Sequence, residues 1–541
     1  MRTKKYFTLN KRLPGMALLA MLILVTSCTK KFNEYNTNQY QATSAMLDED
    51  NLSTGTFFVQ MEKNVFPIAQ QPSFGDEIYQ EVQNLAGDVY SGYMGASNNW
   101  FSGANNTTYA LIPDWYNQGF NRGFVGIMPA WNAIKKAAAT VNPPAYAVAT
   151  IVKVEGMHRV TDMYGPLPYI NFGNGALQNK YDAQKDIYYK FFDELDGAIA
   201  TLTDFNSKNP SATVMATYDF IYGGNVVKWI KFANSLKLRL AMRLAYADPT
   251  KAQSVAESAV SHPIGVMTDA SDIAQLQHTS NLVYNHPLYI ITYNFTDIKM
   301  GATMETYLNG YKDPRISKYF MTATDGLYHG VRNGITITNK ADYANGPFSA
   351  INVAATTPIV WFNPAEAYFL RAEGALRGWA MGSDAKTLYE TGVRTSYTVA
   401  GVTTAADTYL ADATSVQAAY TDSKNAGNSV ASNSTLLSKI TIKYDATATM
   451  ETNLERIITQ KYLAMFPDGQ EAWSEFRRTG YPKVFPVVVN SSGGVISSTT
   501  QIRRLPFPST EYQNNSAGVA GAITQLGGAD NGNTKLWWDK K

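Results

Sequence analysis

Apolar side chains between residues 225 and 246 recur at spacings of three and four, which is the period of one face of an α-helix. The pattern is carried by Trp229, Phe232, Ala233, Leu236, Leu240 and Leu244. Asp248-Pro249 ends the run, because proline does not continue a helix. Four basic residues fall mostly on the other faces: Lys228, Lys231, Arg239 and Arg243. We predict an amphipathic packing helix whose basic residues are solvated or salt-bridged rather than a binding patch.

Further helical patterns lie in the C-terminal half. Asn363 and Pro364 have the types of a capping residue and a first helical residue, and Glu366 completes a capping box. Periodic apolar residues also fill 454–465 and 471–477. Small residues in these helices allow close approach of neighbours, as in paired-helix repeats of the tetratricopeptide kind, although no strict repeat of about 34 residues is present.

Polar segments rich in Gly, Asn, Thr, Ser and Tyr separate the helices and cover residues 85–125, 280–350 and 400–435. Such long insertions on a helical scaffold are where binding residues usually lie. Apolar runs around a Gly-rich centre predict a small hairpin over 487–502. The expected fold class is mostly α: a tetratricopeptide-like helix-pair scaffold with long irregular loop insertions and minor β-hairpins.

The first 27 residues have the composition of an export signal, with a basic start ahead of the apolar run 16–25. That run is shorter than the roughly 20 residues that cross a bilayer. Val25-Thr26-Ser27-Cys28 matches a bacterial lipobox, and Cys28 is the only cysteine. We therefore predict a lipoprotein signal peptide over 1–27, lipidation of Cys28, a tether over 28–53, and a single α-helical ligand-binding domain over 54–541.

Removal of the signal peptide changes the charge balance. The full chain has a formal net charge of +2, and residues 1–27 hold five basic and no acidic side chains, so the mature chain has a net charge of −3. This balance argues against nucleic acid as a partner. Aromatic residues make up 12% of the chain, which is enough for some of them to stack on ligands at the surface.

Sequence motifs of common catalytic sites are absent from the chain: it has no GxSxG, HExxH, Walker A or GxGxxG motif. The five histidines lack metal-ligand spacing, so we expect neither a catalytic site nor a metal ligand set, and no cofactor. The alternative of a structural calcium ion remains, since Asp and Asn oxygens in loops can bind calcium without a linear sequence signature. The alternative of a glycoside hydrolase also remains, because the two catalytic acidic residues of such an enzyme need not be close in sequence.

Two arginine motifs resemble anion clamps, Asp313-Pro314-Arg315 and Arg477-Arg478. Arginine beside an Asp-Pro turn more often closes a structural ion pair, and we favour that interpretation.

Two loop segments combine rings with amides, which suits stacking on sugars and hydrogen bonding to their hydroxyls. The first runs from Tyr90 to Tyr109 and the second from Tyr284 to Phe295. The candidate ligand contacts are Tyr90, Tyr93, Asn98, Asn99, Trp100, Phe101 and Asn105 in the first segment, and Tyr284 and Tyr293 in the second.

Several blocks resemble the SusD/RagB family of outer-membrane nutrient-binding lipoproteins. They keep the family's order and span most of the mature chain: RVTDMYGPLPY at 159–169, YDAQKDIYYKFFDEL at 181–195, and the blocks at 225–244, 365–379, 458–482 and 503–515. The resemblance implies a helix-pair fold and a location at the outer membrane, lipid-anchored and facing the exterior.

The resemblance also implies a partner and a function. The partner is a TonB-dependent transporter of the SusC/RagA kind, to which the lipoprotein delivers its ligand. Family members bind oligosaccharides or polysaccharides, or in some cases peptides, without cleaving them. The leading hypothesis is therefore a non-enzymatic glycan-binding lipoprotein, with a peptide-binding member of the same family and a glycoside hydrolase as alternatives.

Overall fold

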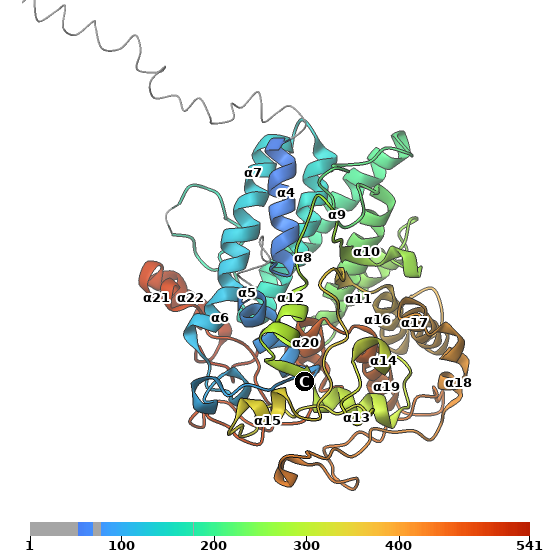
Figure 1. The fold of residues 1–541 in the computed structure, drawn as a ribbon. Helices are drawn as coiled ribbons and strands as arrows, with labels where there is room; N and C mark the ends of the chain where they lie inside the picture. Colours follow the sequence, from blue (N-terminus) through green and yellow to red (C-terminus); the bar gives the residue numbers. More distant parts are fainter. Residues whose placement is uncertain (1–51, 69–76, 177) are drawn as a thin grey trace, which may run out of the picture. The chain divides into compact units, whose positions relative to one another are not determined.

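The computed structural model describes residues 52–68, 77–176 and 178–541. Within these ranges α-helices predominate and strands are few and short, so the mostly α fold class is confirmed (Figure 1). Residues 54–541 form one compact unit. The signal peptide, Cys28 and the tether up to residue 51 lie outside the described residues.

The long helices pack as consecutive pairs. These pairs are α8 (Pro143–Tyr164) with α9 (Gln184–Lys208), α10 (Val226–Arg243) with α11 (Pro249–Val260), and α16 (Pro364–Leu376) with α17 (Ala385–Val399). Helix α19 (Met450–Ala464) packs on α16, and α20 (Gly469–Thr479) follows it in the chain. The helix-pair scaffold expected from the sequence is therefore present.

Local sequence signals fix several helix ends. The Asn225 side chain accepts a hydrogen bond from the Lys228 amide, and the Asn363 side chain accepts one from the Ala365 amide. Pro364 stands at the start of α16, as predicted. Gly480 ends α20 with φ of 80°, a left-handed conformation that glycine adopts without steric cost. The helices predicted near 225, 363, 454 and 471 are confirmed, although α10 ends at Arg243 rather than residue 246.

The remaining helices are shorter. The α-helices are α4 (Leu52–Val65), α5 (Glu77–Tyr79), α6 (Pro113–Asn121), α7 (Met128–Ala138), α12 (Pro287–Tyr289), α13 (Ala302–Gly310), α14 (Ile316–Tyr319), α15 (Lys340–Ala344), α18 (Ala406–Ala411), α21 (Ser509–Asn514) and α22 (Ser516–Leu526). The π-helices are η2 (Gln80–Asp88), η5 (Arg122–Ile127) and η7 (Ile290–Asn294). The 3₁₀ turns are η3 (Trp100–Gly103), η4 (Asn106–Thr108), η6 (Ala270–Asp272), η8 (Thr403–Ala405) and η9 (Ala426–Asn428). The segment 85–125 is thus partly helical, which corrects the expectation that all of it is irregular.

Four short strands form two antiparallel ribbons, β1 (Met94–Ala96) with β3 (Ile298–Met300) and β2 (Ala274–Leu276) with β4 (Ile359–Phe362). Each ribbon joins segments far apart in sequence, so neither is a hairpin. The hairpin predicted over 487–502 is wrong, since no residue there is in a strand. Instead, the Asn490 side-chain amide donates to the Ile496 carbonyl at 2.7 Å and to Ser498 Oγ at 2.9 Å. Side-chain bonds of this kind compete with a strand ladder.

Buried ion pairs connect the central helices. They are Arg239–Glu366 at 2.6 Å, Arg243–Glu475 at 2.8 Å and Arg478–Glu373 at 2.6 Å. All of these side chains are almost completely buried. We predicted that the basic residues of α10 are solvated or salt-bridged, and Arg239 and Arg243 are salt-bridged. A buried pair is costly to break, because the remaining charge stays in a medium of low dielectric.

Neither arginine motif is an anion clamp. Arg315 Nη2 donates to Asp313 Oδ2 at 2.5 Å, and both side chains are fully buried. Arg477 Nη1 donates to the backbone carbonyls of Asp162 at 2.6 Å and Arg503 at 2.8 Å. Both motifs therefore hold the core together, as we favoured from the sequence.

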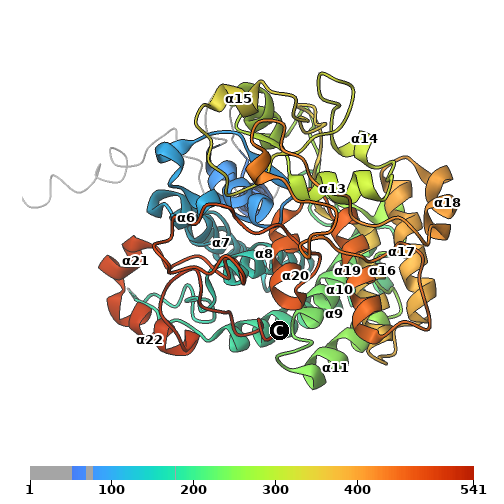
Figure 2. The ribbon, with the colours of Figure 1, turned by 90° about the horizontal axis from the view of Figure 1, so that it is seen from below.

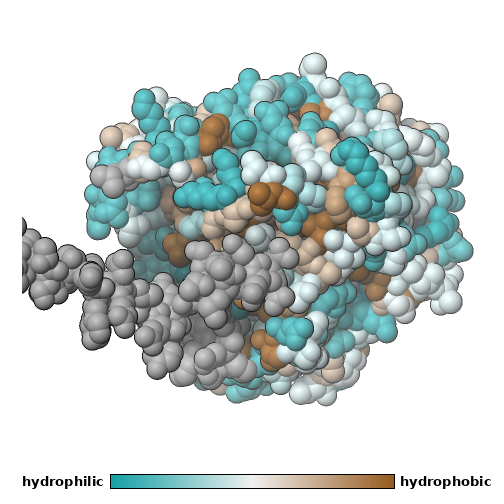
Figure 3. Space-filling view, turned by 90° about the horizontal axis from the view of Figure 1, so that it is seen from above, coloured by the Kyte–Doolittle hydropathy of each residue, from teal (hydrophilic) through white to brown (hydrophobic). Residues whose placement is uncertain are grey.

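One face of the molecule is mainly hydrophilic with small, separate hydrophobic patches (Figure 3). Scattered apolar residues of this kind are normal on a protein surface and do not mark a site by themselves.

Candidate ligand-binding site

The ribbon of β1 and β3 brings the two candidate segments together. Ala96 pairs with Ile298, so the residues after β1 and those before β3 lie at the same end of the ribbon. The Ser97 amide donates to the Asp297 carbonyl at 2.8 Å, and Ser97 Oγ donates to the Thr296 carbonyl at 2.8 Å. The two segments proposed separately from the sequence therefore form one continuous region.

Asp297 links the segments around this end of the ribbon. Its Oδ1 accepts from Asn98 Nδ2 at 2.8 Å and from Lys340 Nζ at 2.5 Å, and its Oδ2 accepts from Gln80 Nε2 at 3.0 Å. Both ribbon views show α15, which begins at Lys340, next to the segment that follows β1 (Figures 1 and 2). The carboxylate is thus fully engaged in positioning, and its charge is balanced by the ammonium group.

Three aromatic rings gather near the end of β1, two on the loop that follows it and one on α6. Trp100 and Phe101 each meet Trp115 edge to face, with ring centroids 5.7 and 5.6 Å apart. Trp115 is 9% exposed and lies in the first turn of α6, whereas Phe101 is 60% exposed and Trp100 is half-buried. Edge-to-face contacts stabilise such pairs by about 0.5–1.5 kcal/mol beyond burial, so the exposed rings rest on a fixed base.

The backbone that carries these rings is strained. Phe101 and Ser102 have φ of 53° and 55°, in the left-handed region that residues with a side chain rarely adopt. This conformation costs roughly 1–2 kcal/mol per residue. Side-chain hydrogen bonds from within the loop hold it, including one from Asn105 Nδ2 to the Trp100 carbonyl at 2.9 Å.

Tyr293 supplies the aromatic part of the second segment. It is 40% exposed, and its ring lies 5.2 Å from that of Tyr289. Its hydroxyl donates to the Ile351 carbonyl at 2.7 Å, and burial raises the pKa of this hydroxyl above its ordinary value. The neighbouring Asn294 is exposed. Ring and amide are therefore both open to a ligand here.

Tyr90, Tyr93 and Tyr284 lie in the interior, at 5%, 0% and 1% exposure. The Tyr93 hydroxyl donates to the Tyr462 carbonyl, and the Tyr284 hydroxyl donates to the Leu276 carbonyl at 2.7 Å. Burial raises the pKa of all three phenols. These rings pack the core and present no face to a surface ligand, which corrects their assignment as contacts.

The amides of the first segment divide in the same way. Asn98 and Asn99 are half-buried, and Asn99 Nδ2 reaches the Thr338 carbonyl at 3.5 Å. Asn105 is 1% exposed and acts within the loop, so it is not a contact either. The predicted residues that keep some surface exposure are Asn98, Asn99, Trp100 and Phe101 on the loop after β1, and Tyr293 on η7.

Sequence reasoning missed Trp115, Asp297 and Lys340. Trp115 had a local signal: it lies two residues after Pro113, and proline is a typical first residue of a helix. Trp115 therefore lies in the first turn of α6, which fixes its ring. Asp297 and Lys340 gave no such signal, because their roles depend on the pairing of distant segments.

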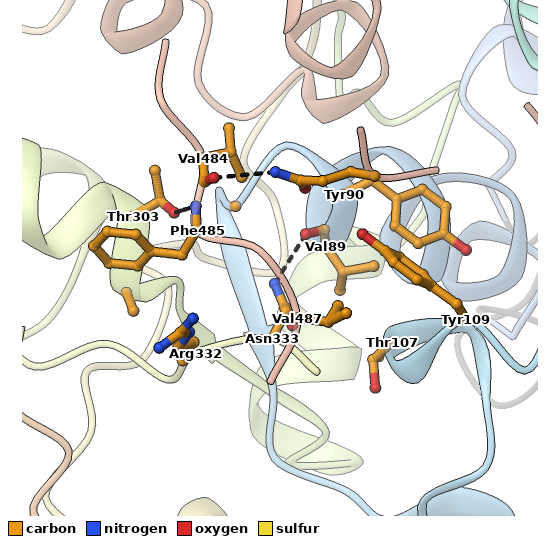
Figure 4. Close-up of a pocket in the computed structure, with 13 residues that line it drawn as sticks. Val89, Tyr90, Thr107, Tyr109, Thr303, Arg332, Asn333, Val484, Phe485 and Val487 are labelled. Atoms are coloured by element: carbon orange, nitrogen blue, oxygen red, sulfur yellow. Dashed lines mark hydrogen bonds between the residues drawn. The ribbon is translucent and has the colours of Figure 1, made fainter. Parts of the chain in front are cut away.

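A small cavity of about 20 Å³ lies beside this region, lined by Tyr90, Tyr109, Arg332, Asn333 and Val487 among others (Figure 4). Space of this size holds about one water molecule and excludes a sugar ring. Within the described part of the chain, Tyr90 Oη and Arg332 Nε have no hydrogen-bond partner. The cavity is therefore too small for a sugar ring, and the open aromatic surface is the candidate binding site in this region.

Among residues 52–68, 77–176 and 178–541, no group of three or more His, Cys, Asp or Glu side chains is placed to hold a metal ion. No helix in these same ranges has the length and apolar character to cross a membrane.

The fold places the chain among α-helical proteins built from helix pairs, and comparisons with known proteins define the class further. Residues 34–539 match the SusD-like family, described as Susd and RagB outer membrane lipoprotein. The chain belongs to this family. A comparison with curated proteins finds no match to this chain.

Solved structures of SusD homologues are similar over nearly the whole chain. A chitin-binding SusD homolog from Flavobacterium johnsoniae is 41% identical with a TM-score of 0.85, covering 90% of this chain and 99% of its own. A SusD homolog from Bacteroides uniformis is 37% identical with a TM-score of 0.83, covering 90% and 99%. One from Bacteroides vulgatus is 34% identical with a TM-score of 0.83, covering 91% and 99%.

Proposed function

We propose that this protein captures a glycan at the cell surface and delivers it to a TonB-dependent transporter of the SusC/RagA kind, without cleaving it. The observation that carries the proposal is the exposed ring of Phe101 with the half-buried ring of Trp100, both resting on Trp115 beside the amides of Asn98 and Asn99. Flat rings stack on the apolar faces of sugars, and amides bind their hydroxyls as both donors and acceptors.

Membership of an outer membrane lipoprotein family supports the location. We propose that Cys28 is lipidated after removal of residues 1–27 and that the acyl chains hold the protein in the outer membrane, facing the exterior. Several acyl chains anchor far more firmly than one, at about 0.8 kcal/mol per buried CH₂. Globomycin treatment, which blocks lipoprotein signal peptidase, or a Cys28→Ala change should leave an uncleaved or unanchored protein.

The chemistry of the surface favours a neutral ligand. Asp297 and Lys340, the charged groups that organise it, are paired with each other, and the open groups are rings and amides. The relative from Flavobacterium johnsoniae is described as chitin-binding, so we propose chitin and its oligosaccharides as the first ligands to examine. The N-acetyl groups of such a polymer offer amides that match the asparagines.

The proposal is tested by calorimetry and affinity electrophoresis of residues 28–541 with chitin oligosaccharides, cellulose, starch and xylan, and with a peptide mixture. We expect one glycan class to bind, with Phe101→Ala and Trp100→Ala each weakening affinity by about tenfold, or 1.4 kcal/mol. The control is Phe57→Ala, which removes an aromatic ring 37% exposed on α4.

Other outcomes have distinct meanings. Binding of peptides alone would retain the family but overturn the glycan assignment. Release of shortened sugars, abolished by a single Asp or Glu change, would contradict a non-enzymatic function. Equal binding by all three variants and the wild-type protein would move the site away from the aromatic surface.

A further inference from the structure

We propose that Asn105 and Thr108 form a side-chain clip that holds Trp100 and Phe101 in a binding-ready position before any ligand arrives. Neither clip residue touches the ligand, so Asn105 is a positioning residue. This inference rests on the proposed function of the aromatic surface, and it assigns to a buried residue the control of that surface.

The loop reverses through three consecutive residues with positive φ: Phe101 at 53°, Ser102 at 55° and Gly103 at 88°. Only the glycine adopts such a conformation without steric cost. A free loop of this sequence would relax toward negative φ and turn the Phe101 ring away from Trp115. The observed shape therefore requires contacts that outweigh the local preference.

The clip supplies these contacts on both sides of the strained pair. Asn105 Nδ2 donates to the carbonyl of Trp100, just before the pair, at 2.9 Å. Thr108 Oγ1 donates to the carbonyl of Gly103, just after it, at 2.7 Å. The backbone amide of Asn105 donates to Thr108 Oγ1 at 3.2 Å, and this bond joins the two halves of the clip.

The clip is itself fixed to the scaffold. Asn105 Oδ1 accepts from the Thr107 amide at 3.0 Å. The neighbouring Asn106 donates from Nδ2 to the Leu85 carbonyl at 3.3 Å and accepts at Oδ1 from the Ile112 amide at 3.0 Å. Leu85 belongs to η2, and Ile112 directly precedes α6, which carries Trp115. The rings and their base are thus held in one frame.

Burial separates this role from direct contact. Asn105 and Thr108 are 1% and 2% exposed, whereas Phe101 is 60% exposed. A ligand that stacks on the ring does not reach the clip. Preorganisation of this kind raises affinity by removing the ordering cost of loop and side chains on binding.

The decisive variant is Asn105→Asp. Its remaining oxygen still accepts from Thr107, but the amide that donates to the Trp100 carbonyl is replaced by an oxygen that repels it. We expect affinity for the glycan bound by the wild-type protein to fall about tenfold, and the amides of Gly103 and Ala104 to exchange hydrogen faster. Asn209→Asp is the matched control, since it breaks the same kind of bond, from Nδ2 to the Phe205 carbonyl at 3.2 Å, on the exposed end of α9.

Rescue distinguishes positioning from general structure. Ser102→Gly, added to Asn105→Asp, removes the steric cost of positive φ at that residue and should restore part of the lost affinity. If Asn105→Asp binds as the wild-type protein does while Phe101→Ala is weakened, the clip has no positioning role and the proposed function stands. If affinity is lost with unchanged hydrogen exchange and no rescue, the positioning role is also wrong. If the wild-type protein binds no glycan, the proposed function is wrong, and the clip then has no glycan site to position.

Discussion

The helical scaffold and the loop surface use polar and apolar groups in opposite ways. The scaffold buries charged side chains in pairs, such as Arg478 with Glu373, while the loop surface exposes the ring of Phe101. Buried pairs contribute little net stability over apolar packing, but they are costly to break and so favour one arrangement of helices. An exposed ring contributes nothing to the core. The proposed binding role would account for its presence on a strained and anchored loop.

The largest effect is expected in the scaffold. Arg478→Met leaves Glu373 and Glu475 with fewer positive partners in the interior and should lower the free energy of unfolding by about 3–5 kcal/mol. Chemical denaturation measures this change. Arg394→Met is the control, because Arg394 and Asp407 form an exposed pair whose loss should cost less than about 1 kcal/mol. Similar losses for both variants would contradict the contrast between the two regions.

The junction between the regions should be less sensitive. Asp297→Ala removes the acceptor shared by Asn98, Lys340 and Gln80, and we expect a loss of about 1–3 kcal/mol in stability. Because this carboxylate joins the two segments, ligand affinity should fall as well. Hydrogen exchange should rise at residues 97–99 and 340–344 and stay constant in α8. Uniformly faster exchange would indicate global destabilisation instead.

A pH change acts on buried carboxyl groups of the scaffold, and Glu155 is one of them. Burial raises the pKa of Glu155 to about 8, against the opposing effect of Arg239, from an ordinary value of 4.5. Between these values the folded carboxyl binds a proton that the unfolded one has released, so stability falls as pH rises. His158 opposes this trend only below its ordinary pKa of 6.5, since burial lowers the pKa of that ring.

The useful window is therefore pH 7 to 8. Here Glu155 should reduce the free energy of unfolding by up to about 1.4 kcal/mol per pH unit, and Glu155→Gln should remove that part of the slope. Denaturant titrations at both pH values measure it. Identical slopes in the variant and the wild-type protein would show that Glu155 is ionised in the folded state.

The smallest effect is expected at Tyr293. Tyr293→Phe removes the hydrogen bond to the Ile351 carbonyl but keeps the ring, so stability should fall by about 0.5–1.5 kcal/mol and glycan affinity should change little. Calorimetry with the same ligand tests this. A large loss of affinity would mean that the hydroxyl, rather than the ring, contacts the sugar.

The sequence predicts local features of this molecule well and distant pairing poorly. The caps at Asn225 and Asn363 were readable, because a capping residue and its helix are adjacent in the chain. Residue type alone did not separate Tyr93 from Phe101, since both are aromatic. The Tyr93 ring is buried and its hydroxyl donates to a carbonyl in the core, whereas the Phe101 ring, which has no polar group, is exposed. The union of the two ligand segments depends on the pairing of β1 with β3, which has no local signal.

That pairing also orders the events of biosynthesis. Trp100 leaves the ribosome about two hundred residues before Ile298, and until the later strand arrives the first candidate segment lacks its hydrogen bonds to Thr296 and Asp297. Contacts between such distant segments form slowly, because a long stretch of chain must be closed first. A nascent chain that stops before β3 therefore carries the Trp100 and Phe101 rings without their partner strand, and the proposed ligand-binding surface is completed late in folding.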